Sequence, residues 1–522
     1  MSGISVGLEN EVLNVGRPQP MSQMMAACET LASVPPSNIV LSRPQGWWHI
    51  WFGFPALLGG ELVTTVLMFA HRGIGDPDIW WHLRNAEELV RTGHFVRADA
   101  YSYTVWGAKW INHEWLGELP YYAGWRWLGL QGLYVVMALA LVGIFLLLYL
   151  LAYRRARDYR AAALACGIAI PLTTVSFGPR TLLFGWIFLL LELLVFQASE
   201  KSPAWLWALP LLFTLWVNTH GSWLIGIVLL LAFSAASCFE VSAGRIESHR
   251  RPLRELKQLA TVATFCVAAL FLNPYGWRLV FYPFDLAFRQ KLNVSHVEEW
   301  QSPDFHSIRG KLLLALVLAF LVLILVRRSR LLLHEVLFLL IALYAAFTYS
   351  RFLFLAAIMV TPLLAAELSF LRARPVGREK PVLNLVMMTA MLSLIIWQVP
   401  SNAQLSAGIS EEYPVAAIGH LSSLRPVDRV LNDYDWGGYL IWHARQVPVF
   451  VDSRVDIFEY SGVFADYLDI MGLKNSLALL RKHHVRYVLY GREKALAYLL
   501  RNTPEWKVIY EDKTAVLFER VQ

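Results

Sequence analysis

Residues 75–84 read GDPDIWWHLR and lie just after an apolar run from about Trp47 to Ala70. A hydrocarbon core of roughly 30 Å is crossed by about 20 apolar residues, so this run is long enough to span a membrane. The stretch therefore places Asp76, Asp78 and His82 where the first span emerges into water. Ionisable groups at a membrane face usually have a function, so this stretch is the first candidate site.

The composition is that of a membrane protein with several spans. Of the 522 residues 57% are hydrophobic and 16% charged, whereas about a quarter are charged in soluble domains. The net charge of +7 comes from short basic clusters between apolar runs, a pattern that fixes membrane topology. We therefore expect no nucleic-acid partner. The four cysteines have no CxxC spacing, which indicates neither a disulfide framework nor a zinc site.

Apolar runs of membrane length, or nearly so, recur along the chain and predict about eleven transmembrane helices. With a cytoplasmic N-terminus, every compact basic cluster lies on the inner side, as the positive-inside rule requires. This predicts a multi-pass protein of the plasma membrane, the inner membrane in a bacterium. The runs are 48–70, 130–152, 160–177, 181–198, 203–218, 221–239, 258–272, 311–326, 331–349, 352–371 and 382–399.

Three parts follow from this pattern. Residues 1–46 carry Pro, Ser, Gln and charges of both signs and are predicted to form a disordered cytoplasmic tail. Residues 47–400 form the transmembrane domain, with a large first extracytoplasmic loop at 71–129. Residues 401–522 are predicted to form a small extracytoplasmic α/β domain, because charge rises and apolar runs shorten there. Its expected strands are 447–451, 487–490, 507–510 and 515–519, and its expected helices are 461–482 and 492–501.

The first loop begins with a predicted helix at 77–92. Asp76 can cap it, Pro77 suits its first position, and Gly93 can end it. We expect this helix to lie in the membrane interface with one polar edge turned to the bundle. An Asp at a helix start can also serve only as a cap, worth about 1 kcal/mol. The expected apolar stripe is Ile79, Leu83, Ala86 and Val90, and the polar edge is Asp78, His82 and Asn85.

Further polar side chains are predicted on the same side of the membrane. Arg180, His220 and Arg351 occupy three separate tight turns, and Glu114 lies in the first loop. Each has a structural alternative, because a turn Arg can reach lipid headgroups and a turn His can cap a span.

The residues of the first loop and the spans after it resemble the GT-C superfamily of polyprenol-dependent glycosyltransferases. Asp76-Pro77 through His82, Arg84 and Gly93 resembles the loop of the catalytic subunit of oligosaccharyltransferases. Residues 432–439 (NDYDWGGY), followed by VDSR at 451–454, are weakly similar to that family's Trp-Trp-Asp-Tyr-Gly motif, with the order changed to Asp-Trp-Gly. The chain also resembles uncharacterised bacterial multi-span membrane proteins that share an Asn-x-His-Gly turn (218–221) and an Asn-Pro-Tyr-Gly turn (273–276).

The resemblance implies an inverting glycosyltransferase of the cell envelope that moves a sugar from a polyprenyl-phosphate donor to an extracytoplasmic glycan, lipid or protein acceptor. Asp76, Asp78 and His82 would be the catalytic residues. Either Asp could be the base or a ligand of Mg²⁺ or Mn²⁺. Substrate would be bound by Glu114, Arg180, His220 and Arg351.

Two alternatives remain open at this point. A transporter or flippase of lipid-linked glycans would also be a multi-span protein, but such proteins commonly show inverted repeats and ionisable groups near mid-membrane. Here no internal repeat is evident, and the polar candidates cluster in loops, which favours an enzyme. A non-catalytic membrane scaffold is the second alternative.

Overall fold

The computed structural model describes residues 51–70, 74–327, 329–369, 380–425 and 427–521. The predicted disordered tail, residues 1–46, lies outside these ranges. Residues 52–522 form one compact unit. The predicted boundaries between its transmembrane and C-terminal parts stay predictions.

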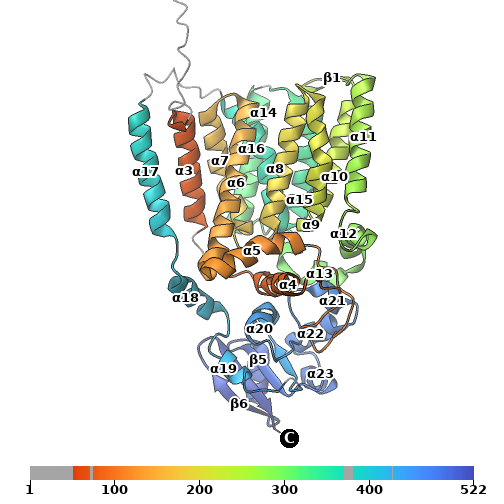
Figure 1. Ribbon diagram of the computed structural model, residues 1–522, viewed down its shortest axis with the longest axis vertical. Helices are drawn as coiled ribbons and strands as arrows, with labels where there is room; N and C mark the ends of the chain where they lie inside the picture. Colours follow the sequence, from red (N-terminus) through yellow and green to blue (C-terminus); the bar gives the residue numbers. More distant parts are fainter. Residues whose placement is uncertain (1–50, 71–73, 328, 370–379, 426, 522) are drawn as a thin grey trace, which may run out of the picture. The chain divides into compact units, whose positions relative to one another are not determined.

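Six stretches of helix among the described residues are long and apolar enough to cross a membrane, which supports an integral membrane protein (Figure 1). They are α6 (Leu130–Ala156), Tyr159–Ser176 with α7 (Tyr159–Thr173), α8 (Leu182–Ser199), α14 (Ile308–Arg327), Ser350–Leu368 with α16 (Leu353–Leu368), and α17 (Pro381–Gln398). Shorter helices match the other predicted runs: α3 (Phe54–Phe69), α9 (Leu209–Thr219), α10 (Trp223–Ser237), α11 (Leu253–Ala269) and α15 (Leu333–Thr348). Each predicted run thus coincides with a helix, while the number of spans and their direction stay predictions.

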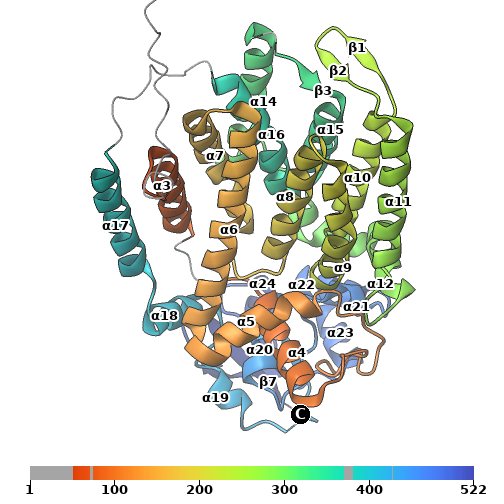
Figure 2. The same ribbon diagram turned by 45° about the horizontal axis from the view of Figure 1, so that its top comes forward.

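Helix α16 is the centre of this bundle. In its membrane-length window 83% of the residues are buried, against 6% in α17, although both helices are apolar all round. A helix that is apolar on every face is either buried in protein or surrounded by lipid, and the burial separates the two cases. Figures 1 and 2 both show α17 beside α3 at the edge of the bundle.

Two helices of the first loop, α4 (Asp78–Thr92) and α5 (Trp115–Leu128), lie beside one end of the bundle (Figure 1). Helix α4 ends at Gly93, whose φ of 71° is the left-handed conformation that glycine adopts without strain. The predicted apolar stripe is buried at Ile79, Leu83 and Ala86, but Val90 is 62% exposed. Three of the four stripe residues are therefore packed against protein, and Val90 is exposed on the last turn of the helix. Trp80 and Trp81 are buried instead, so the packed surface is wider at the start of the helix.

The C-terminal region contains a four-stranded mixed sheet in the order β4-β5-β7-β6. β4 (Val430–Asn432) is parallel to β5 (Tyr487–Gly491), and β7 (Ala515–Arg520) is antiparallel to both β5 and β6 (Trp506–Glu511). The last three strands were predicted, and β4 was not. The predicted strand at 447–451 is wrong: Val449 forms only an isolated bridge with Ser102 of the first loop.

Short helices surround this sheet. The predicted helix at 461–482 is two helices, α22 (Val463–Met471) and α23 (Ser476–Lys482), separated by a turn in which Leu473 and Asn475 have positive φ. The other C-terminal helices are α18 (Asn402–Glu412), α19 (Ile418–Leu421), α20 (Gly437–His443), α21 (Val455–Glu459) and α24 (Ala495–Arg501). Two further helices, α12 (Trp277–Arg289) and α13 (Lys291–His296), follow α11 in the chain. A separate small sheet is formed by β1 (Val241–Ala243), β2 (Ile246–Ser248) and β3 (Leu331–Leu332).

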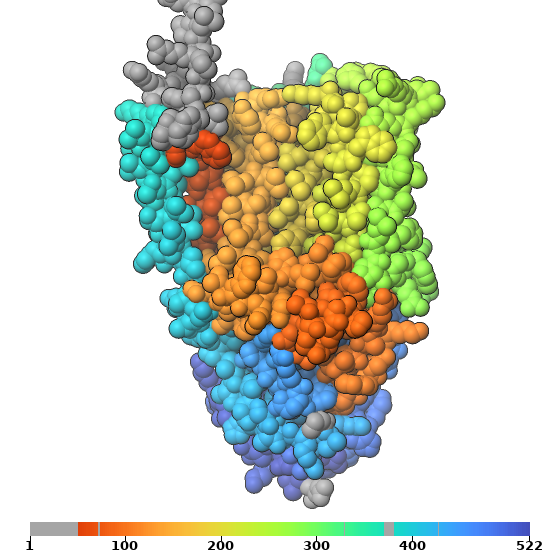
Figure 3. All heavy atoms as spheres, viewed as in Figure 1, coloured from red at the N-terminus to blue at the C-terminus, as the bar shows by residue number. Residues whose placement is uncertain are grey.

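A buried ion-pair network joins the C-terminal region to the first loop. Arg454 donates to Asp452 at 2.6 Å and to Asp99 at 2.7 Å, and all three side chains are at most 1% exposed. Its guanidinium also lies near the ring faces of Tyr101 and Trp110, 5.0 and 4.8 Å from their centroids. In Figure 3 the first-loop residues, in orange, lie between the helices and the blue C-terminal residues. The first loop is therefore packed against protein rather than free at the membrane surface.

Candidate active site

Asp76 and Asp78 lie at the start of α4 with their carboxylates in different surroundings. Asp76 is buried; its Oδ1 accepts the Asp78 backbone N–H at 2.9 Å, and its Oδ2 accepts from Arg180. Asp78 Oδ1 accepts the indole N–H of Trp81 at 3.2 Å. Burial and the nearby negative charge of Asp76 raise the pKa of Asp78 to about 7. Asp78 is therefore poised to exchange a proton near neutral pH, whereas Asp76 is held in an ion pair.

Arg180 bridges two carboxylates that are far apart in the sequence. Its Nε donates to Asp76 and its Nη1 donates to Glu299, in the 3-10 helix Glu298–Trp300. The backbone carbonyl of Arg180 accepts the Tyr121 hydroxyl at 3.0 Å, which fixes the turn before α8. Burial opposes the charge of Arg180, but Asp76 and Glu299 outweigh it and raise the pKa of the guanidinium. Arg180 therefore supplies a permanent positive charge that is held in a fixed position in the site.

Glu114 is surrounded by three imidazoles. Its carboxylate lies 3.3 Å from the Nε2 atoms of His82, His113 and His220, and it accepts the Thr181 hydroxyl at 2.9 Å. Burial would raise the pKa of Glu114, but His113 and His220 outweigh it and hold this pKa well below its usual range. Glu114 is therefore an anion at every pH at which the protein is expected to work.

The imidazoles around Glu114 differ in charge. Burial would lower the pKa of His82, but the 2.9 Å hydrogen bond of its Nδ1 with Glu118 and the charge of Glu114 raise it to about 9. Burial lowers the pKa of His220 to about 4 despite Glu114. His82 is thus protonated at neutral pH and His220 is neutral. Glu118 is fully buried and also accepts from Asn112 at 2.9 Å, which holds it in place beneath His82.

Arg351 lies at the start of the helical stretch Ser350–Leu368, with its guanidinium 4.2 Å from the centroid of the Trp300 ring. Its charge interacts with those of Glu299, Arg180, Glu114 and Asp78.

The structure therefore brings together all seven residues that the sequence analysis selected. They come from α4 and the residues just before it, from the residue before α5 and from three turns between helices of the bundle. Their roles in catalysis and binding stay predictions. The seven are Asp76, Asp78, His82, Glu114, Arg180, His220 and Arg351.

Sequence reasoning missed several residues of this cluster. Glu299 was available as an acidic residue in loop 273–310, which the predicted topology places on the same side as Arg180. His113 was also missed, although its position next to Glu114 in the sequence was an available signal. Ser453 is also part of the site, because its Oγ accepts the Trp81 indole N–H at 3.0 Å. No local pattern could have paired these two residues, which are 372 positions apart.

The segment 432–439, compared above with an acceptor motif, has mainly structural contacts. The Asn432 side chain donates to Val451 O and accepts from Phe450 N, both at 2.8 Å, and Trp436 donates to Glu412 O at 2.9 Å. Tyr434 is nearer the site, because its hydroxyl donates to Ser453 O at 3.4 Å.

The arrangement of side chains bears on the predicted cation. In the described part of the chain, no group of three or more His, Cys, Asp or Glu side chains is placed to hold a metal ion. Asp76 and Glu299 both face the Arg180 guanidinium, which a cation between them would have to displace. The side chains as arranged do not fit a divalent cation at this point. Mg²⁺ or Mn²⁺ held by Asp76 and Asp78 stays a prediction.

The fold is similar to that of the archaeal oligosaccharyltransferase AglB from Archaeoglobus fulgidus. In complex with an inhibitory peptide and a dolichol-phosphate, AglB matches 83% of this chain and 69% of its own, with 13% identity and a TM-score of 0.55. The Archaeoglobus fulgidus oligosaccharyltransferase tethered to an acceptor peptide containing the NVT sequon matches 91% of this chain and 75% of its own, with 14% identity and a TM-score of 0.55. ArnT from Cupriavidus metallidurans, bound to undecaprenyl phosphate, matches 91% of this chain and 98% of its own, with 13% identity and a TM-score of 0.49.

This structural similarity confirms the predicted resemblance to GT-C glycosyltransferases at the level of the fold. No model of a protein family matches the chain. No curated protein matches it either. The TM-scores of 0.55 show a shared fold, and identities of only 13 to 14% leave activity to be argued from the site.

Proposed function

We propose that this protein is an inverting membrane glycosyltransferase that takes its sugar from a polyprenyl-phosphate donor. The observation that carries the proposal is the gathering of Asp78, with its pKa of about 7, and two arginines at one end of a GT-C-like bundle. Sugar transfer from a lipid phosphate needs a base for the acceptor and positive charge for the departing phosphate. The dolichol-phosphate and peptide bound to AglB support these ligand classes.

Asp78 is the proposed base. It removes the proton from the acceptor hydroxyl or amide as the acceptor attacks the anomeric carbon. The bond from that carbon to the phosphate oxygen breaks, and its electron pair leaves with the polyprenyl phosphate. A single displacement from the opposite face inverts the configuration at the anomeric carbon. A base works best with a pKa near the working pH, which favours Asp78 over the ion-paired Asp76.

Arg180 and Arg351 are the proposed phosphate ligands, because a guanidinium can grip phosphate with two parallel hydrogen bonds. Asp76 and Glu299 hold Arg180 in place, and Trp300 supports Arg351. Protonated His82 adds positive charge beside Glu114. The proposed topology places this site on the extracytoplasmic side, with the N-terminus in the cytoplasm.

The experiment that tests the proposal separates transfer from transport. Purified protein in liposomes is supplied with a labelled polyprenyl-phosphate sugar and an extract of cell-envelope acceptors. A labelled product together with free polyprenyl phosphate supports the transferase. Movement of intact donor across the bilayer without cleavage contradicts it and favours the transporter. A strain lacking the protein is expected to lose one glycan from its envelope profile, which identifies the acceptor.

The pH dependence of transfer follows from Asp78. The proposed base acts in its deprotonated form, so transfer is expected to fall as the pH drops through about 7, the pKa of Asp78. The measurement is the pH profile of kcat/KM. A rate that stays constant from about pH 5 to about pH 8 would remove Asp78 from the role of base, because a free carboxylic acid titrates near 4.

Replacing Arg180 by Ala is expected to create a cation site. The change leaves Asp76 and Glu299 facing each other without the guanidinium, and paired carboxylates suit Mn²⁺. We expect Mn²⁺ to bind the variant at least roughly tenfold more tightly than the unaltered protein, measured from the signal of free Mn²⁺ in electron paramagnetic resonance. Arg84→Ala, which removes one of the two arginines that contact Glu87 on α4, the other being Arg445, is the control. Stoichiometric binding to the unaltered protein, abolished by Asp76→Asn, would instead assign the carboxylates to a cation.

A further inference from the structure

A cavity of about 770 Å³ lies far from the candidate active site. Helix α8 joins the two places: it begins just after Arg180 and ends at Ser199, where it lines the cavity with Gln197 and Ala198. Its 18 residues rise about 27 Å, so the cavity and the active site lie near opposite ends of the bundle. The cavity is therefore a separate site and not an extension of the first one.

The inner wall of this cavity is apolar. Leu151 of α6, Leu193 and Leu194 of α8, Phe338 of α15 and Leu363 of α16 contribute to it. Cavities of this size hold molecules as large as a drug or part of a lipid. Because four membrane helices form the wall, the natural occupant of such a surface is a hydrocarbon chain.

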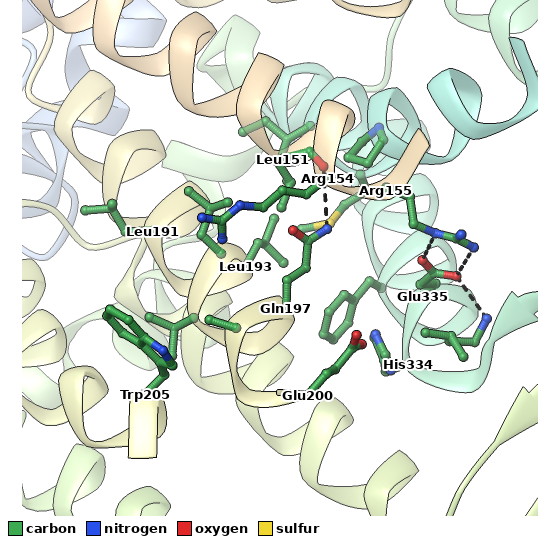
Figure 4. A pocket seen from close by; sticks show the side chains of 18 of the residues that line it. Leu151, Arg154, Arg155, Leu191, Leu193, Gln197, Glu200, Trp205, His334 and Glu335 are labelled. Carbon is green, nitrogen blue, oxygen red and sulfur yellow. Dashed lines mark hydrogen bonds and ion pairs between the residues drawn. The ribbon is translucent and has the colours of Figure 1, made fainter. Parts of the chain in front are cut away.

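Basic side chains line the mouth. Arg154, Arg157 and Lys201 are exposed there and make no ion pair with another described residue, and Glu200 is the exposed acid beside them. Arg155 is neutralised by Glu335, whose carboxylate it binds through two nitrogens, the longer contact being 3.0 Å. In Figure 4 the Arg154 guanidinium reaches across the apolar side chains towards Leu191. The side chains at the mouth thus carry a net positive charge, and the Arg154 guanidinium lies over the apolar wall.

We propose that this cavity binds a membrane phospholipid with an anionic headgroup. Its acyl chain would lie against the apolar wall, and its phosphate would meet Arg154 and Lys201. A soluble anion would leave the apolar wall unexplained, and a neutral lipid would leave the basic mouth unexplained. Basic pockets between membrane helices on the cytoplasmic side are typical sites for anionic headgroups. The basic clusters at 154–160 and 201 are also the ones that the sequence places inside.

The test uses the full-length protein and a double variant, Arg154→Ala with Lys201→Ala. Protein purified in mild detergent is incubated with phosphatidylglycerol or phosphatidylcholine, and bound lipid is counted by native mass spectrometry. We expect the unaltered protein to hold one phosphatidylglycerol and to discriminate against phosphatidylcholine. A basic side chain near an anionic lipid contributes about 1 kcal/mol, so the double variant is expected to bind about 30-fold more weakly.

A matched control and a second variant make the result decisive. Arg254→Ala with Lys257→Ala removes two exposed basic residues from α11, outside the cavity, and is expected to leave binding unchanged. Ala208→Trp, at an exposed position that lines the cavity, is expected to exclude the acyl chain without removing charge. Equal lipid binding by all forms, equal loss in the control, or equal binding of phosphatidylglycerol and phosphatidylcholine would each overturn the assignment. None of these outcomes bears on the proposed transferase.

Discussion

Replacing Asp78 by Asn is expected to reduce sugar transfer by about 10² to 10⁴-fold, the usual contribution of a positioned base. Asparagine has the same shape, and its carbonyl oxygen can still accept the Trp81 indole N–H that Asp78 accepts at 3.2 Å. It cannot take up a proton at neutral pH. The loss is therefore expected in kcat/KM with the fold intact, measured with purified protein and a polyprenyl-phosphate sugar.

The control for this prediction lies on the same helix. Glu88→Gln makes the same carboxylate-to-amide change at a residue whose partner is the exposed Arg91, and it is expected to leave transfer unchanged. Turnover retained by Asp78→Asn would remove Asp78 from the mechanism. An equal loss in both variants would indicate a general effect on α4 and not the loss of a base.

Replacing Arg454 by Met is expected to destabilise the protein by about 3 to 5 kcal/mol. The variant keeps a long side chain but leaves Asp99 and Asp452, both 0% exposed, without their shared cation. Breaking a buried pair from one side is costly because a charge remains buried without compensation. The measurement is unfolding in detergent, followed by tryptophan fluorescence. Arg454→Lys keeps the positive charge but lacks the planar guanidinium that can donate to both carboxylates. We therefore expect an intermediate loss of stability.

An exposed ion pair is the comparison for Arg454. Arg91 and Glu88 have side chains that are 68% and 30% exposed, and such pairs are worth about 0 to 1 kcal/mol. Arg91→Met is therefore expected to unfold almost like the unaltered protein. If Arg454→Met were as stable as Arg91→Met, the buried network would not be what joins the C-terminal region to the first loop.

Local signals in the sequence located the elements that carry the site. Pro77 and Gly93 bracket a helix found at Asp78–Thr92, and each predicted apolar run coincides with a helix. The alternation of basic and non-basic loops assigned Arg180, His220 and Arg351 to one side, and the three turns do meet at one place. This works because helix ends and membrane-length runs depend on neighbouring residues alone.

The errors share a different cause. Residues 447–451 have the composition of a strand, yet Val449 pairs only with a bridge partner in the first loop, so no ladder forms there. Residues 461–482 were predicted as one helix, but a turn with positive φ at Leu473 and Asn475 divides them into α22 and α23. Composition and period describe what a segment can do, and the available partners decide what it does.

By itself the sequence determined that this is a helical membrane protein with ionisable residues gathered beside the ends of its helices. It could do so because hydropathy and the residues that start and stop helices are properties of short segments. Only the tertiary structure decided that Arg180 pairs with Asp76 and Glu299, that three histidines surround Glu114, and that Asp78 is left with a pKa of about 7. Arg180 and Glu299 are 119 positions apart. The partners and charge of a side chain depend on burial and on residues brought close by packing, and no local pattern contains that information.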